Sequence, residues 1–170
     1  MTNKIRHIST SVDTFRKYFD DVKDLNSQGE VPTFTLKEGQ KKLSLYFIDA
    51  EKYYSERAYG FLTLILEHIA LVSGKMIAKN RGVSVEEVID NAISLYERKN
   101  ADYGDAFYIA AERFGLGTCM ARMFDKLERL KNAWRGNDLK VADEKAEDTL
   151  IDLMCYSMMT VLYIKENSKQ

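Results

Sequence analysis

Residues 118–134, TCMARMFDKLERLKNAW, and residues 141–164, VADEKAEDTLIDLMCYSMMTVLYI, decide the fold. Both stretches place apolar residues three and four positions apart, which is the spacing of one face of an α-helix. The segment between them begins Arg135-Gly136-Asn137-Asp138, a composition typical of a turn. Because a short connection makes two helices antiparallel neighbours, the C-terminal part of the chain is expected to be a helical hairpin.

The helical pattern continues from this hairpin towards the N-terminus. Two sequences of the form Ser/Thr-x-x-Glu, beginning at Thr35 and Ser84, are typical of capping boxes and predict helix starts. The whole chain contains one proline, Pro32, and proline is the residue that most strongly breaks helices. The predicted helices cover residues 9–25, 36–53, 55–80, 84–99, 118–134 and 141–164, with a short helix before Gly115. The only strand candidate is 31–34. The fold is therefore predicted to be all-α, a bundle of five to seven helices.

Composition favours one globular domain over residues 1–170, with 1–53 as an N-terminal helical extension and 54–170 as the core that carries the site. The net charge of -1 provides no overall field that would attract nucleic acid or an anionic membrane. The most apolar run, 58–72, is interrupted by two polar residues and is too short to span a bilayer. Two cysteines, Cys119 and Cys155, are expected to be free thiols in a reducing cytoplasm.

Two acidic pairs on the hairpin are candidate metal ligands. Asp125 and Glu128 are three residues apart on the first helix, and Asp148 and Asp152 are four apart on the second, so each pair shares one helical face. Carboxylate oxygens from two facing helices suit Mg²⁺ or Mn²⁺. The alternative is a solvated face with ordinary salt bridges, and Asp152 favours the metal most because apolar residues surround it in the sequence.

Basic and aromatic residues near these acids are candidate substrate ligands. Lys126 and Arg129 alternate with the acids of the first helix, and both suit a phosphate chain. Lys99, Asp102 and Tyr103 form a further polar cluster at a predicted helix break. Their alternatives are a helix cap for Asp102 and a core position for Tyr103.

These residues together resemble a known family. The sequence has Lys99-x-x-Asp102-Tyr103-Gly104, then Arg122-x-x-Asp125-Lys126-x-x-Arg129-Leu130, then Glu147-Asp148-Thr149-x-x-Asp152-Leu153-x-x-Tyr156. Over about residues 95–164 this set resembles the nucleotide modification associated domain, type 1, a family of helical proteins of phages and bacteria. The resemblance implies a nucleotide ligand, for which Arg122 joins the candidate residues, and a cytoplasmic location in a bacterium or a phage-infected host.

The pattern is also similar to the MazG and all-α dUTPase group of nucleotide pyrophosphatases, which hold magnesium between acidic pairs on two helices. That similarity implies a MazG-like core in the C-terminal half, with Asp125, Glu128, Asp148 and Asp152 as magnesium ligands and catalytic residues. The second pair here is spaced four residues apart, whereas the group has three.

Three functions compete at this point. The first is a metal-dependent nucleoside triphosphate pyrophosphohydrolase of nucleotide-pool control or nucleotide modification. In that enzyme, Mg²⁺ would activate a water molecule and neutralise the phosphates. The second is a module that binds a nucleotide without cleaving it, and the third is a structural helical protein that assembles through its methionine-rich face. A homo-oligomer, most simply a dimer, is expected because the helices predicted at 55–80 and 141–164 are apolar over more than one stripe.

Overall fold

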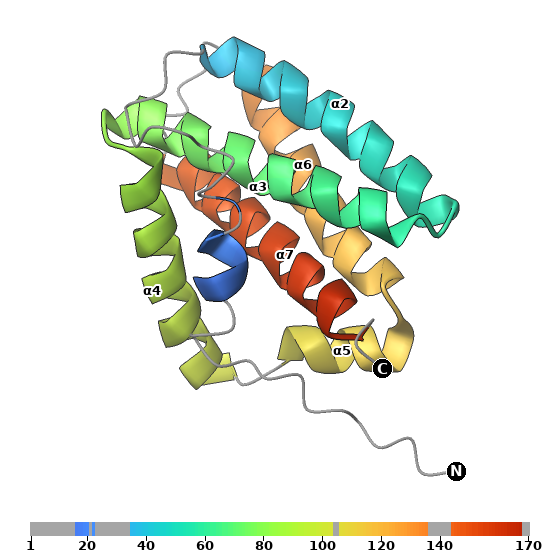
Figure 1. The fold of residues 1–170 in the computed structure, drawn as a ribbon. Coiled ribbons are helices and arrows are strands. Elements are labelled where there is room, and N and C mark those ends of the chain that lie inside the picture. The colour runs from blue at the N-terminus through green and yellow to red at the C-terminus, as the bar shows by residue number, and fades with distance from the viewer. Residues whose placement is uncertain (1–15, 21, 23–34, 104–105, 136–143, 168–170) are drawn as a thin grey trace, which may run out of the picture.

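The computed structural model describes residues 16–20, 22, 35–103, 106–135 and 144–167. Every regular element in these residues is a helix, which confirms the all-α prediction (Figure 1). The helices are α2 (Leu36–Ser55), α3 (Tyr59–Arg81), α4 (Val85–Tyr103), α5 (Ala106–Phe114), α6 (Gly117–Arg135) and α7 (Glu144–Asn167). Residues 16–20 and 22 are also helical. The strand candidate at 31–34 and most of the helix predicted at 9–25 lie outside the described residues.

Both capping sequences form the predicted hydrogen bonds. The Thr35 side chain accepts a hydrogen bond from the Glu38 backbone N–H at 3.1 Å, and the Ser84 side chain accepts one from Glu87 at 3.2 Å. Each bond satisfies an N–H group in the first turn that has no partner within its helix. The start of α2 at Leu36 and of α4 at Val85 follows from these caps.

Three predicted boundaries were wrong by three or four residues. The helix α4 ends at Tyr103 and not at residue 99, and α7 ends at Asn167 and not at residue 164. The helix predicted from residue 55 begins at Tyr59, because the chain turns sharply after α2 and Arg57 takes a positive φ of 56°. This conformation is uncommon for a residue with a Cβ. Because an arginine and not a glycine occupies the position, the sequence did not indicate a turn there. The end of α3 was predictable, since Gly82 follows it in the left-handed conformation with φ of 70°.

The central helix of the bundle is α7, which packs against α3, α6 and α4 (Figure 1). Ser157 of α7 lies against Met123 of α6, and Asp152 lies against Lys126. Residue numbers rise along one helix as they fall along the other, so α6 and α7 are antiparallel and the predicted hairpin is confirmed. The pairs Glu67–Lys165 and Arg81–Glu147 establish the same antiparallel relation between α3 and α7.

Burial on several sides requires that the hydroxyl groups of the central helices find partners within the protein. Ser73, Ser157 and Thr160 are buried, and each donates a hydrogen bond to the backbone carbonyl four residues earlier, at 2.7–2.8 Å. Gly74 lets α3 approach α7 closely, because a Cβ there would lie 3.2 Å from Met154 Sδ. Satisfied polar groups and close backbone contact are what permit α3 and α7 to form the core.

By length and composition, α3 is the single described helix that could cross a membrane, and 72% of its most apolar window is buried inside the protein. A core helix of a bundle has the same composition, and this is the role that α3 has in the structure. The α2 helix packs along α3 and covers one of its sides.

Core burial predicts a large difference between two leucine substitutions. Leu66 of α3 is fully buried and Leu45 of α2 is 52% exposed. Leu66→Ala is expected to lower the free energy of unfolding by about 2–5 kcal/mol, because it removes buried methyl groups and leaves a cavity. Leu45→Ala, its matched control, is expected to change it by less than about 1 kcal/mol. Urea denaturation followed by circular dichroism measures both, and equal losses would contradict this core.

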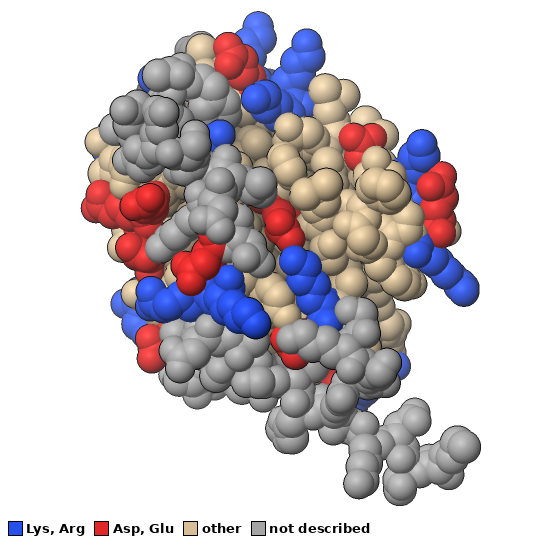
Figure 2. All heavy atoms as spheres, in the orientation of Figure 1, with Lys and Arg blue, Asp and Glu red and all other residues tan. Residues whose placement is uncertain are grey.

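The predicted homo-oligomer requires exposed apolar residues for its contact, and α2 and α3 provide them. Leu45 and Ile48 of α2 and Phe61 and Leu64 of α3 expose about half or more of their surface. In the view of Figure 2, a broad area of uncharged residues covers α2 and α3, with charged side chains around its margin. We expect light scattering at micromolar concentration to give a mass above the 19.6 kDa of one chain. A mass of 19.6 kDa would show a monomer.

Candidate functional site

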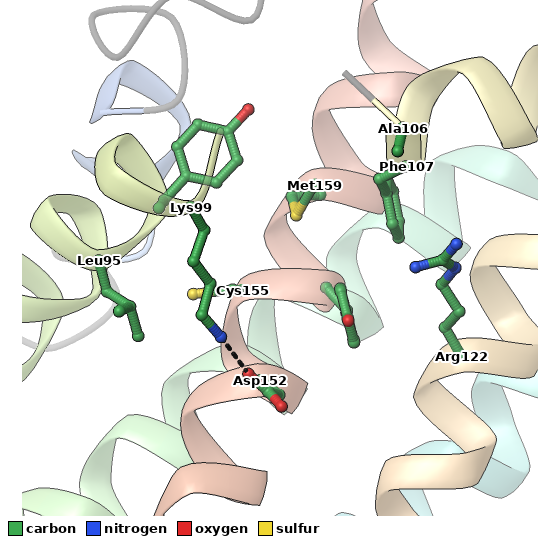
Figure 3. Close-up of a pocket in the computed structure, with 10 residues that line it drawn as sticks. Leu95, Lys99, Ala106, Phe107, Arg122, Asp152, Cys155 and Met159 are labelled. Atoms are coloured by element: carbon green, nitrogen blue, oxygen red, sulfur yellow. Dashed lines mark hydrogen bonds and ion pairs between the residues drawn. The ribbon is translucent and has the colours of Figure 1, made fainter. Parts of the chain in front are cut away.

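A cavity of about 340 Å³ opens between α4, α5, α6 and α7 (Figure 3). Its lining is Leu95, Tyr96 and Lys99 of α4, Ala106 and Phe107 of α5, Arg122 of α6, and Asp152, Cys155, Tyr156 and Met159 of α7. Leu95 and Lys99 enter from one side and Arg122 from the other, with α7 between them. The cavity is thus apolar along much of its wall, with two cations and one carboxylate at one end.

Asp152 is the carboxylate of this cavity, and two lysines hold it. Lys99 Nζ lies 3.2 Å from Oδ1, and Lys126 Nζ lies 2.8 Å from Oδ2. The Asp152 side chain is 23% exposed and that of Lys126 17%, whereas Lys99 is 52% exposed. Two ammonium groups on one carboxylate leave a net positive charge at this end of the cavity.

The environment of Lys99 keeps it protonated. Partial burial alone would lower the pKa of Lys99, but the charge of Asp152 and its hydrogen bond outweigh burial and raise the pKa. Because the pKa of Lys99 is raised in the folded protein, its charged amine stabilises the fold fully at any pH below the ordinary lysine pKa of 10.5. This contribution is lost only as pH rises through the raised pKa.

Two stacked rings form the wall next to these charges. Phe107 and Tyr156 have ring centroids 5.5 Å apart and an angle of 8° between their planes. The Arg122 guanidinium lies 5.7 Å from the Phe107 centroid, and Lys126 Nζ lies 5.8 Å from that of Tyr156. Cations over ring faces are attracted by the negative face of each ring. The rings therefore help to hold the cations beside the cavity.

Helical spacing explains why these groups meet. Arg122 and Lys126 are four residues apart on α6, and Asp152 and Tyr156 are four apart on α7, so each pair lies on one face. The antiparallel packing of α6 and α7 turns the two faces towards each other. Lys99 reaches Asp152 from α4, at the other side of α7. Asp152 thus links three helices.

The predicted carboxylates do not gather in this structure. Asp125 and Asp148 are exposed, and Glu128 pairs with Lys131 at 3.4 Å on its own helix. Asp152 is committed to the two lysines. Among the residues that the structure describes, no group of three or more histidine, cysteine, aspartate or glutamate side chains could hold a metal ion. The donor set as placed does not fit a bound Mg²⁺ or Mn²⁺.

Some of the predicted substrate ligands lie at the cavity and others do not. Lys99 and Arg122 line the cavity, and Lys126 does not line it but bonds to Asp152, which does. Arg129 is exposed and does not line the cavity. Asp102 and Tyr103 end α4, and their side chains lie outside the described residues. Glu147, part of the sequence motif, accepts hydrogen bonds from Arg81 Nε at 2.6 Å and from Asn80 at 3.3 Å, so it ties α7 to α3.

Several residues of the cavity wall were not predicted as site residues from the sequence, namely Leu95, Tyr96, Ala106, Phe107, Cys155 and Met159. They are ordinary apolar residues of helical stripes, and only the way α4 and α5 pack beside α7 distinguishes them. Tyr156 was present in the motif without a role. Tyr156 lies four residues from Asp152, and Arg122 and Lys126 have the same spacing on the facing helix. This shared spacing is the signal that could have identified Tyr156.

The thiol in the cavity is chemically quiet. Burial, with the nearby charge of Asp152, raises the pKa of Cys155 to about 12, and burial raises that of Cys119 to about 11. Both cysteines are free, as predicted. Because the thiolate is the reactive form of cysteine, a thiol whose pKa is raised this far is weakly reactive at neutral pH.

The lysine contacts predict a pKa change in one variant. Asp152→Asn is expected to lower the pKa of Lys99, because burial then acts on the amine without the opposing carboxylate charge. Asp148→Asn, one turn away on an exposed side chain, is expected to leave it unchanged. NMR titration of the lysine side-chain resonances measures both, and an unchanged Lys99 pKa in Asp152→Asn would contradict the ion pair.

Comparison with known proteins finds one family match, over the C-terminal part of the chain. The nucleotide modification associated domain 1 family matches residues 99–164, a segment that contains Lys99, Arg122, Lys126, Asp152 and Tyr156. No curated protein and no solved structure matches the chain. The likeness to MazG and all-α dUTPase proteins stays a prediction. The resemblance seen in the motifs is confirmed, because residues 99–164 match the model of the nucleotide modification associated domain 1 family.

Proposed function

We propose that the cavity between α4, α5, α6 and α7 binds a nucleotide. The observation that carries this proposal is the meeting of Lys99, Lys126 and Arg122 beside the stacked rings of Phe107 and Tyr156. A nucleotide combines a phosphate anion with a flat aromatic base, and this cavity offers a partner for each.

Cations at one end of the cavity supply the phosphate partners. Lysine binds phosphate as a point charge, and arginine as a planar fork with two parallel hydrogen bonds. Lys126 is mostly buried, so water screens its charge less than that of a surface lysine. The family name, which refers to nucleotide modification, is consistent with such a ligand.

The aromatic and apolar wall supplies the base partner. Stacking of a base on an aromatic ring contributes about 1–3 kcal/mol and depends little on which base it is. Phe107, Met159 and Ala106 line the part of the cavity away from the lysines. The volume of about 340 Å³ is at the lower end of the usual range for small-molecule sites.

Asp152 holds the two lysines in place while no phosphate is bound. Without it, two ammonium groups would repel each other across a partly buried space. A phosphate would compete with Asp152 for the same N–H donors. Asp152 is therefore proposed to position the lysines, and its contacts explain the arrangement without a metal ion.

The pyrophosphohydrolase activity expected from the sequence stays a separate prediction. Asp152 is the one acid that lines the cavity among the described residues, so it is the carboxylate to test. Phosphate or pyrophosphate release from deoxynucleoside triphosphates with Mg²⁺ would establish the activity. Loss of that release in Asp152→Asn would assign it to this site, and absence of release would leave a nucleotide-binding module.

Nucleotide binding is tested by thermal shift with each of the deoxynucleoside monophosphates and triphosphates, with and without Mg²⁺. A ligand that binds the folded state raises the melting temperature by mass action. Lys126→Ala is expected to weaken binding at least about tenfold, since it removes a charged hydrogen-bond donor. Tyr156→Ala is expected to weaken it by a similar factor through lost stacking, about 1–3 kcal/mol.

Two matched variants control this experiment. Lys131→Ala removes a lysine of the same helix that pairs with Glu128 and does not line the cavity. Tyr156→Phe keeps the ring. Both are expected to retain binding within about twofold, which corresponds to less than about 0.5 kcal/mol. Binding that Lys126→Ala and Lys131→Ala weaken equally would place the nucleotide elsewhere, and no shift with any nucleotide would refute the proposal.

A further inference from the structure

A second cavity, of about 260 Å³, lies beside the first along α4 and α7. Its polar lining comes from Arg81, Asn91, Ser94 and Arg98, and its apolar lining from Val88, Ala92, Leu95 and Ile151. The residues Arg81, Asn91, Ser94 and Arg98 precede the segment that matches the family, so the match assigns them no role.

The two cavities share a wall. Leu95 lines both of them, Arg98 of the second is next to Lys99 of the first, and Ile151 is next to Asp152. Ala92 contacts Cys155 further along the same two helices. The cavities are therefore neighbours along α4 and α7, and the two together are called the trough.

Side chains along this trough change in a regular order. Its apolar end contains Met159 and Phe107, its middle contains Lys99 and Asp152, and Arg98 and Arg81 follow. Lys126 lines neither cavity but bonds to Asp152 from α6. Met159 and Asp152 are separated by seven residues, or about 10 Å along the axis of α7. Asp152 and Glu147, the partner of Arg81, are separated by five residues, or about 7–8 Å. A ligand with an aromatic end and an extended anionic chain has the same order of groups.

Charge in the second cavity favours an anion. The structure describes no ion pair for Arg98 with any residue that it places. Arg81 is held by Glu147, which fixes its position and partly neutralises it. Ser94 and Asn91 add a hydroxyl and an amide, both of which donate hydrogen bonds. Among the described residues, no carboxylate lines this cavity, in contrast to the first.

We propose that the cavity lined by Arg81 and Arg98 is a second anion-binding subsite, which takes the terminal phosphate of a nucleotide whose base lies in the first cavity. This inference rests on the proposed function. Arg98 binds the terminal phosphate by its guanidinium, Arg81 lies behind it, and Lys99 and Lys126 contact the phosphate nearer the sugar. Affinity then increases with the length of the phosphate chain.

The test is isothermal titration calorimetry of the full chain with paired probes, a deoxynucleoside monophosphate and the triphosphate of the same base, in EDTA to exclude metal-dependent turnover. Unaltered protein is expected to bind the triphosphate more tightly. Arg98→Ala is expected to weaken the triphosphate at least about fivefold, because one charged hydrogen-bond donor is lost, and to change the monophosphate less than about twofold. Arg98→Lys, which keeps the charge, is expected to restore part of the loss.

Arg113→Ala is the matched control. Arg113 is an exposed arginine of α5 that lines neither cavity, so its removal changes the net charge equally. Equal effects of Arg98→Ala and Arg113→Ala, or equal weakening of both probes by Arg98→Ala, would overturn the subsite and leave nucleotide binding intact. If neither probe binds the unaltered protein, the proposed function and the subsite fail together. Circular dichroism of each variant verifies that it is folded.

Discussion

Asp152 between Lys99 and Lys126 is the contact on which the arrangement of the site depends. It is the only acid between residues 150 and 164, a stretch of α7 that is otherwise mostly buried in the core. A partly buried carboxylate is costly unless it is paired, and here each oxygen atom has its own ammonium group. The contact joins α4, α6 and α7, and the cavity opens where these three helices and α5 meet.

The two lysines explain why this site is better suited to an anion than to a metal ion as it stands. A divalent cation would need several carboxylates close together, and the described residues offer no such group. Three cations near one carboxylate leave an excess of positive charge in an otherwise apolar cavity. The charge of the whole chain, -1, conceals this local excess, because the acids on the surface balance it. Local placement, and not the overall charge, determines which ligand the cavity suits.

Much of the fold could be predicted from local sequence. The helix starts after Thr35 and Ser84 follow from caps, and the hairpin of α6 and α7 follows from two apolar stripes and a short connection. The start of α3 could not be predicted in the same way, because Arg57 adopts a positive φ that residues other than glycine seldom take. Lys99, Lys126 and Asp152 were all candidate site residues, Lys99 from a polar cluster at a predicted helix break and the other two from their places on the acidic helix faces. That they bond to one another depends on how α4 packs beside α7, and no local pattern reports such a contact. The same holds for Phe107 and Met159, whose place in the wall comes only from the tertiary packing.

In the proposed function, a nucleotide occupies the cavity beside Met159 and Tyr156. Methionine methyl NMR tests it most directly, since Met159 lines the cavity and Met76 is fully buried in α3 and does not line it. On titration with a deoxynucleoside triphosphate, the Met159 methyl resonance is predicted to shift with saturation while that of Met76 stays in place. A saturable shift of Met76 with Met159 unchanged, or no shift of either, would contradict the account.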